Sequence, residues 1–112
     1  MLSQSLTLLP NTSTVGAILS DSYRAAGYYN LGQGLHTIVV DLHMFKGHVT
    51  LQGTLSMNPN DADWFNIHDQ TYGDDSTEIT NIVSSNFYGN FVWIRAIGVL
   101  DSGSISSIMY NF

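Results

Sequence analysis

The segment from Phe45 to Met57, FKGHVTLQGTLSM, constrains the fold of this chain more than any other part of the sequence. Apolar and polar side chains alternate along it. The apolar positions are Val49, Leu51, Leu55 and Met57, and the polar ones are His48, Thr50, Gln52, Thr54 and Ser56. Because successive side chains of a strand point to opposite faces, this pattern predicts a strand with one buried and one solvated face. Such strands are typical of antiparallel sheets, whereas parallel sheets covered on both faces give continuous apolar runs.

Turn residues recur at close intervals along the rest of the chain and separate short segments rich in β-branched and aromatic residues. The expected strands are Gln4–Leu9, Val15–Leu19, His36–Leu42, Val49–Met57, Trp64–Ile67, Thr77–Val83, Phe91–Leu100 and Ile105–Tyr110. Short strands with regular turns between them are typical of sandwiches and barrels. The sequence therefore predicts an all-β fold, a compact antiparallel β-sandwich of jelly-roll-like type, forming a single domain over residues 1–112.

The C-terminal part carries the clearest expected pairing. Phe91–Leu100 is apolar on both faces, which predicts a central strand, with Arg95 accommodated by an ion pair or a hydrogen bond. The DSGS segment at Asp101–Ser104 resembles a hairpin turn, so we expect Ile105–Tyr110 to pair back on Phe91–Leu100. Tyr110 and Phe112 share one face, which predicts that the C-terminus is tied into the sheet.

Two N-terminal features are less regular. The segment Asp21–Ala26 is expected to form one helical turn, because Ser or Asp can cap a helix and Gly27 can end it. The segment Met1–Pro10 has no basic stretch and no apolar run typical of a signal peptide, so we expect a protein made and used without Sec-type export. Its strand could pair within its own subunit or reach into a neighbour, and the sequence leaves both open.

The chain is acidic and poor in charge. Charged residues make up 11% of it and the net charge is −6, whereas an average soluble domain has about 25% charged residues. Its permanent cations, Arg24, Lys46 and Arg95, are too few for a phosphate-tracking patch or for attraction to an anionic membrane. We therefore expect no nucleic-acid partner and no membrane. The absence of cysteine excludes disulfides, thiolate nucleophiles and Cys-based zinc sites.

Catalytic constellations are missing from the sequence. No serine lies in a G-x-S-x-G context, and Gly32-Gln33-Gly34 lacks the further glycines and the following helix of a phosphate cradle. Asp61 and Asp63 lie on a polar turn without an apolar environment that would raise the pKa of either carboxyl group. We therefore expect a protein that is not an enzyme and uses no cofactor.

Two groups of side chains are candidates for metal binding, the histidines and the acidic turns. His36 and His43 have opposite parity on a strand and point to opposite faces, which disfavours a transition-metal site. Oxygen ligands for calcium could come from two acidic turns, at Asp61, Asp63, Asp74 and Asp75. Their spacing does not match the twelve-residue calcium loop, and Asn and Asp are common turn residues in their own right. We expect no metal, with these four carboxylates as the alternative.

Aromatic side chains follow or flank several turns, and they are the strongest candidates for contact with a ligand or partner. They are Tyr28, Tyr29, Trp64, Phe65 and Tyr72. Aromatics at loop tips are common anchors of protein interfaces and of sugar-binding platforms. Large aromatics also close the open ends of a sandwich core. Both roles remain open for these five residues, and Arg95 is expected to act within the structure instead.

Three segments taken together carry a family resemblance. They are GYYNLGQGLHTIVVDLHMFKGHVTLQGTL at Gly27–Leu55, DADWFNI at Asp61–Ile67 and GNFVWIRAIGVLDSGSISSIMYN at Gly89–Asn111. This set resembles a group of small structural proteins in the virions of marine tailed phages, particularly cyanophages. The resemblance implies a non-enzymatic virion component and assigns no site residues.

The expected function joins this resemblance with the low charge and the missing catalytic groups. We expect an accessory virion structural protein, favoured as a capsid decoration or cement protein that binds the capsid exterior by surface complementarity. Its partners would be other virion proteins and sister copies, for example in a trimer over a capsid symmetry point. It would be located in the virion and assembled in the host bacterial cytoplasm. The alternatives are a tail, collar, baseplate or fibre module, and a carbohydrate-binding module that recognises host surface glycans.

Overall fold

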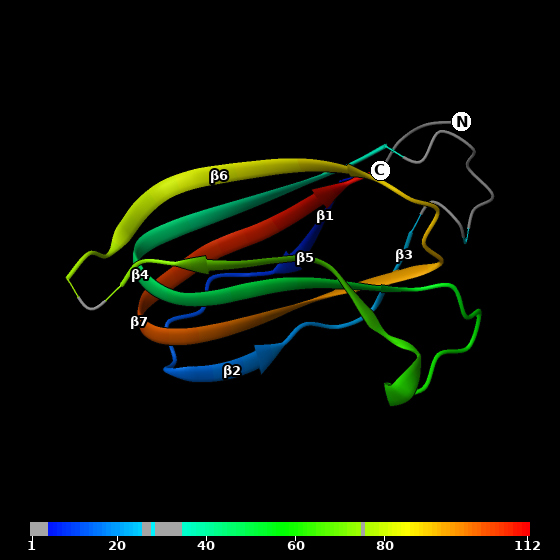
Figure 1. Ribbon diagram of the computed structural model, residues 1–112, viewed down its shortest axis with the longest axis horizontal. Helices are drawn as coiled ribbons and strands as arrows, with labels where there is room; N and C mark the ends of the chain where they lie inside the picture. Colours follow the sequence, from blue (N-terminus) through cyan, green and yellow to red (C-terminus); the bar gives the residue numbers. More distant parts are fainter. Residues whose placement is uncertain (1–4, 26–27, 29–34, 75) are drawn as a thin grey trace.

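The computed structural model describes residues 5–25, 28, 35–74 and 76–112 (Figure 1). The strands are β1 (Ser5–Leu9), β2 (Gly16–Leu19), β3 (Tyr23–Arg24), β4 (Leu35–Thr54), β5 (Phe65–Tyr72), β6 (Ile79–Tyr88) and β7 (Trp93–Asn111), and a short 3-10 helix, η1, spans Asp61–Asp63. Every pairing between these strands is antiparallel. The predicted all-β antiparallel sandwich is confirmed. No helix among the described residues is long and apolar enough to cross a membrane.

Two long strands organise the sandwich. β4 and β7 pair with each other from Thr37–Asn111 at one end to Thr54–Trp93 at the other. Both strands bend back on themselves at the same end of the molecule, at the left of Figure 1. Each therefore contributes one half to each of two layers. The first layer has the order β1, β7, β4, β6, and the second places β2 and β3 beside β7, then β4, then β5.

The bend depends on residues that leave the usual strand geometry. The β4–β7 register shifts on both sides of Lys46, which marks a β-bulge that increases local bending. Met44 has φ 47° and Gly103 has φ 75°, both in the left-handed region. Phe45 lies inside the bend with none of its surface exposed, and its ring packs against Tyr72 with centroids 6.2 Å apart.

The core lies between the two layers and follows strand alternation. Side chains of both halves of β4, such as Ile38 and Leu51, meet those of both halves of β7, such as Ile94 and Ile108, and all four are at most 1% exposed. Each of these residues alternates with a neighbour that is only partly buried. The two bent strands thus supply most of a single hydrophobic cluster.

The expected C-terminal hairpin is wrong. Phe91–Leu100 and Ile105–Tyr110 do not pair with each other, because both belong to β7 and each half pairs with β4. The DSGS segment turns β7 back between the two layers, so its halves lie in different layers and do not pair through their backbones, and Gly103 makes that bend possible by accepting a positive φ. Likewise, His36–Leu42 and the strand expected from Val49 are two halves of β4.

Two further expectations need correction. Val49 and Leu51 are buried as predicted, but β4 ends at Thr54, and Leu55 and Met57 lie beyond it, 65% and 53% exposed. Instead of a helical turn at Asp21–Ala26, the chain forms the short strand β3, because pairing with β7 satisfies its backbone better than an isolated turn would. Ala26 lies outside the described residues.

The central position of Phe91–Leu100 and the anchoring of the C-terminus are both correct. β7 pairs with β1, β2, β3 and β4, more partners than any other described strand has. Ile108, Tyr110 and Phe112 are all buried, so the end of the chain is held in the core.

Candidate functional site

The outer face of the second layer carries a connected group of polar and aromatic side chains. Arg95 lies opposite Gln52 in the β4–β7 ladder, and its Nε donates a hydrogen bond to Gln52 Oε1 at 2.8 Å. Gln52 Nε2 in turn donates to Asn66 Oδ1 on β5 at 3.0 Å. The Arg95 guanidinium lies 4.2 Å from the centre of the Trp64 ring, within the range of a cation–π contact.

A second guanidinium lies on aromatic rings at the β3 side of the same face. Arg24 of β3 lies opposite Trp93 of β7, two residues before Arg95. Its guanidinium is 4.6 Å from the Tyr28 ring centre and 5.7 Å from the Trp93 ring centre. Tyr28 and Trp93 meet edge to face at 5.4 Å, and Trp93 Nε1 donates to the Met57 carbonyl at 3.0 Å. We call the set of Tyr28, Arg24, Trp93, Arg95 and Trp64 the aromatic–arginine row.

Beyond the row, this face divides into a polar and an apolar half. On the β5 side, Thr50 Oγ1 donates to Asp69 Oδ1 at 3.0 Å, and His48 contacts both Thr71 Oγ1 and Asp69 Oδ1. On the β2 side, Ile97 pairs with Leu19, which is 54% exposed. The face therefore offers a partner hydrogen-bonding groups and exposed hydrocarbon next to each other.

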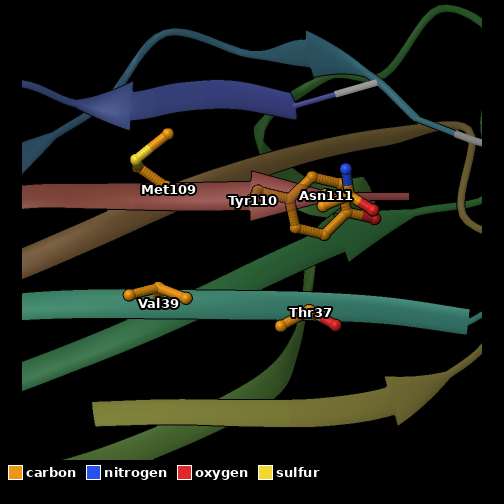
Figure 2. A pocket seen from close by; sticks show the side chains of 5 residues that line it. All are labelled: Thr37, Val39, Met109, Tyr110 and Asn111. Atoms are coloured by element: carbon orange, nitrogen blue, oxygen red, sulfur yellow. The ribbon is translucent and has the colours of Figure 1, made fainter. Parts of the chain in front are cut away.

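The outer face of the first layer carries a shallow pocket, shown in Figure 2. Thr37 and Val39 of β4 and Met109, Tyr110 and Asn111 of β7 line it, and its volume is about 170 Å³. Pockets for whole small-molecule ligands measure roughly 300 to 1,000 Å³. This pocket therefore has room for a single side chain of a partner.

The structure separates the five aromatic residues singled out in the sequence. Tyr28 and Trp64 belong to the aromatic–arginine row. Phe65 is 42% exposed, and its ring lies 5.8 Å from that of Phe91. Tyr72 is a correction, because it packs in the core against Phe45 and, at 9% exposed, offers little surface for contact. Tyr29 lies outside the described residues.

The acidic turns use their carboxylates to hold the backbone. Asp63 Oδ2 accepts from the Asn60 N–H at 2.8 Å, which caps η1, and Asp61 is exposed in the same turn. Asp74 Oδ1 accepts from the backbone and side chain of Ser76, and the backbone bond is the main reason that the pKa of Asp74 is lowered. Asp75 lies outside the described residues. Within the described ranges, no three His, Asp or Glu side chains gather as a metal site would require.

Sequence reasoning missed two members of the row, Arg24 and Trp93. Trp93 lies in a segment that is apolar on both faces, so it did not stand out as a surface residue. Arg24 lies in the segment that was expected to be helical. The available signal was the spacing of Trp93 and Arg95, which puts both on one face of a strand. Arg95 donates a hydrogen bond to Gln52, as expected, but it is only partly buried and also belongs to the candidate contact surface.

Comparison with known proteins relates the chain to others through its fold. No protein-family model matches it, and a search of curated proteins finds no match. Among solved structures, the SPBc2 prophage-derived protein YomS aligns with 97% of this chain and 90% of its own, with a TM-score of 0.60 and 9% identity. The K2 cleaved adhesin domain of Lys-gingipain aligns with 96% of this chain and 82% of its own, with a TM-score of 0.54 and 8% identity.

A third solved structure has a similar fold. The K3 cleaved adhesin domain of Lys-gingipain from Porphyromonas gingivalis aligns with 84% of this chain and 62% of its own, with a TM-score of 0.53 and 7% identity. At such identities the likeness establishes the fold alone. The bent-strand sandwich is thus shared with a prophage-derived protein and with adhesin domains.

Proposed function

We propose that this protein is an accessory structural module of a phage particle, which attaches by surface complementarity and catalyses no reaction. The observation that carries the proposal is the aromatic–arginine row. It consists of Trp, Tyr and Arg, the residue types most enriched at the energetic centres of protein interfaces. It also places Arg24 and Arg95, two of the three permanent cations of a chain with net charge −6, on one face.

Exposed apolar side chains elsewhere on the molecule support an assembled protein over an isolated monomer. Val15, Ile82 and Tyr88 are 69%, 64% and 77% exposed. Single exposed apolar residues are ordinary, but here they accompany an unusually low charged fraction of 11%. Contact with neighbouring proteins would remove this surface from water.

The placement in a phage particle is supported by the resemblance of three segments to virion proteins of marine tailed phages. It is also supported by the fold shared with a prophage-derived protein. Within the particle, we favour decoration of the capsid exterior, where many copies can hold a shell through individually weak contacts. A position in the tail, collar, baseplate or a fibre is the alternative, and it would give a small copy number fixed by the symmetry of the tail.

Attachment can be tested with empty capsids of the encoding phage, prepared without this chain. Purified protein should co-sediment with them, and Trp64→Ala should weaken binding by at least about tenfold, because loss of an interface anchor costs about 2 kcal/mol or more. Met44→Ala is the matched control, since Met44 is 51% exposed at the bend, away from the row. Circular dichroism must show that both variants stay folded.

Two outcomes would contradict the proposed attachment. In one, the wild-type protein does not co-sediment with capsids or with tails. In the other, Met44→Ala weakens binding as much as Trp64→Ala does, which would remove the row from the interface.

Glycan binding is the second candidate function, and one local arrangement favours it. The Arg95 guanidinium contacts the Trp64 ring and donates to the Gln52 amide, which in turn is hydrogen-bonded to the Asn66 amide. Sugar sites combine an aromatic ring with oriented polar groups of this kind. A glycan array should then give a signal that Trp64→Ala abolishes in a folded protein, and an array without signal would remove this candidate.

A further inference from the structure

Strand β6 forms an open edge of the first layer. It runs over ten residues, Ile79–Tyr88, and among the described residues it pairs with β4 alone. In Figure 1 it is the uppermost labelled strand. An edge of this length leaves a row of backbone N–H and C=O groups without strand partners, and such a row can pair with another strand.

β6 lacks the features with which proteins usually prevent edge pairing. Its sequence, ITNIVSSNFY, contains no charged residue and no proline. Natural edge strands are commonly protected by lysine, by proline, or by shortness. The other edges differ, since β5 carries His68 and Asp69, and β1 and β2 have only five and four residues. The edge at β6 is therefore the one best suited to accept a further strand.

The side chains that β6 directs into the sandwich are incompletely covered. Ile79, Val83 and Phe87 pack against the hydrophobic core but remain partly exposed. They lie at the boundary of the core, where no further strand covers them among the described residues. A strand added beyond β6 would extend the layer and complete their burial.

The hydrogen bonds of β6 show which residues face the open edge. The Ile82 N–H donates to Asn81 Oδ1 at 2.9 Å and so lies outside the β4 ladder. In an antiparallel strand, the N–H and C=O of one residue point to the same side, and the side alternates along the strand. Thr80, Ser84 and Asn86 therefore also direct their backbone groups to the open edge.

We propose that β6 pairs with β6 of a second copy, antiparallel and centred on Val83, so that two first layers join into one continuous sheet. In this register Val83 meets Val83 of the other copy, and Ile79 meets Phe87. Asn81 meets Ser85. On the inner face of the sheet, apolar side chains therefore oppose apolar ones and polar side chains oppose polar ones. Thr80 opposes Asn86 and Ile82 opposes Ser84, which are the residues whose backbone groups face the edge.

A second copy fits this edge because the strand is self-complementary in sequence. Shifting the centre to Ser84 would place Val83 against Ser85 and Asn81 against Phe87, which mixes polar and apolar side chains. The absence of charge on β6 matters as well. Each copy has a net charge of −6, so an edge without charged side chains avoids adding local repulsion between two copies.

This pairing goes beyond the proposed function, because it uses a different layer from the aromatic–arginine row. Loss of pairing would leave attachment to the particle intact, and loss of attachment would leave pairing intact. The two failures are therefore distinguishable. A two-fold pair at this edge would supply a homo-oligomer, but a dimer in place of the trimer considered from the sequence.

The register can be tested by disulfide cross-linking, since the chain has no cysteine of its own. Directly opposed residues that are not hydrogen-bonded lie about 4.5 Å apart at Cα, within disulfide range. Val83→Cys should therefore give a covalent dimer under mild oxidation. Asn86→Cys should not, because the two Asn86 positions are separated by six residues, about 20 Å along the strand. Equal cross-linking at both positions, or none at Val83→Cys, would overturn the register.

The pairing itself can be tested by sedimentation equilibrium. Ile82→Lys places two like charges near the two-fold axis and should raise the dimer dissociation constant by at least about tenfold. Leu19→Lys is the matched control, because Leu19 is similarly exposed and lies on β2. It should leave the constant within about twofold. A wild-type chain that stays monomeric at millimolar concentration, or equal effects of the two lysines, would overturn pairing through β6.

Discussion

Gly103→Ala is expected to lower the free energy of unfolding by about 3 kcal/mol or more. Gly103 has φ 75°, which costs an alanine about 1–2 kcal/mol. A Cβ atom there would also lie 2.0 Å from the Met44 carbonyl oxygen and 2.7 Å from that of His43. Both contacts are with the backbone of β4 at its bulge, so neither can be relieved by a side-chain rotation. Urea denaturation followed by circular dichroism measures the effect.

Gly16→Ala provides the control for Gly103→Ala. Gly16 also has a positive φ, 119°, but a Cβ atom there meets nothing within 4 Å. It should report the backbone cost alone, and Gly103→Ala should exceed it by at least about 1.5 kcal/mol. Equal effects would contradict the bend of β7 over β4. In a free hairpin turn, Gly103→Ala would lose only the free energy that the positive φ costs an alanine.

His36→Phe is expected to lower the free energy of unfolding by about 3 kcal/mol at pH 8, because it removes the hydrogen bonds of the buried Tyr110 hydroxyl and of the partly buried Gly89 carbonyl. The His36 side chain has no exposed surface. Its Nε2 bonds to the Gly89 carbonyl and its Nδ1 to the Tyr110 hydroxyl. A carbonyl can only accept, so Nε2 carries the proton, Nδ1 accepts from Tyr110, and the ring is neutral.

The same geometry makes stability depend on pH. Burial lowers the pKa of His36 from its ordinary value of 6.5, and the bond to Gly89 opposes this in part. The unfolded chain therefore binds a proton more readily than the folded one. The stabilisation is fully present above about pH 6.5 and is lost as the pH falls below that value.

Unfolding free energies measured between pH 8 and pH 5 check this dependence. The wild-type protein should lose stability toward pH 5, and His36→Phe should lose less over the same range. His43→Phe is the control, because His43 is exposed on the same strand, and it should follow the wild-type curve. An identical acid-induced loss in wild type and His36→Phe would show that another group governs the dependence.

Alternation in the sequence predicted the buried faces of β4 and β7, but it predicted neither the end of β4 at Thr54 nor the strand β3. Val49 and Leu51 on β4, and Ile108 and Tyr110 on β7, are buried as their parity required. The bends were not predictable in this way, because glycine and aspartate at Asp101–Ser104 suit a hairpin turn within one sheet as well as a bend between two layers. Only the ladder between β4 and β7, which joins residues far apart in the chain, distinguishes the two.

The candidate site was predictable in part for a related reason. Trp64 and Tyr28 were identified by their positions after turns, but the row also needs Arg24 beside Trp93, a neighbourhood created by the pairing of β3 with β7. Tyr72 was misassigned because its place before Gly73 resembles a loop tip. Pairing of β5 with β4 turns its ring inward against Phe45, which local sequence does not indicate.

We propose that this sandwich adheres to other proteins of a phage particle through the outer surfaces of its layers. An electron cryo-microscopy map of the assembled particle of the encoding phage tests it most directly. We predict many copies of the chain on the capsid exterior, with Trp64 and Arg95 buried against a neighbouring protein. A particle that lacks the chain, or one in which the aromatic–arginine row faces only solvent, would contradict the claim.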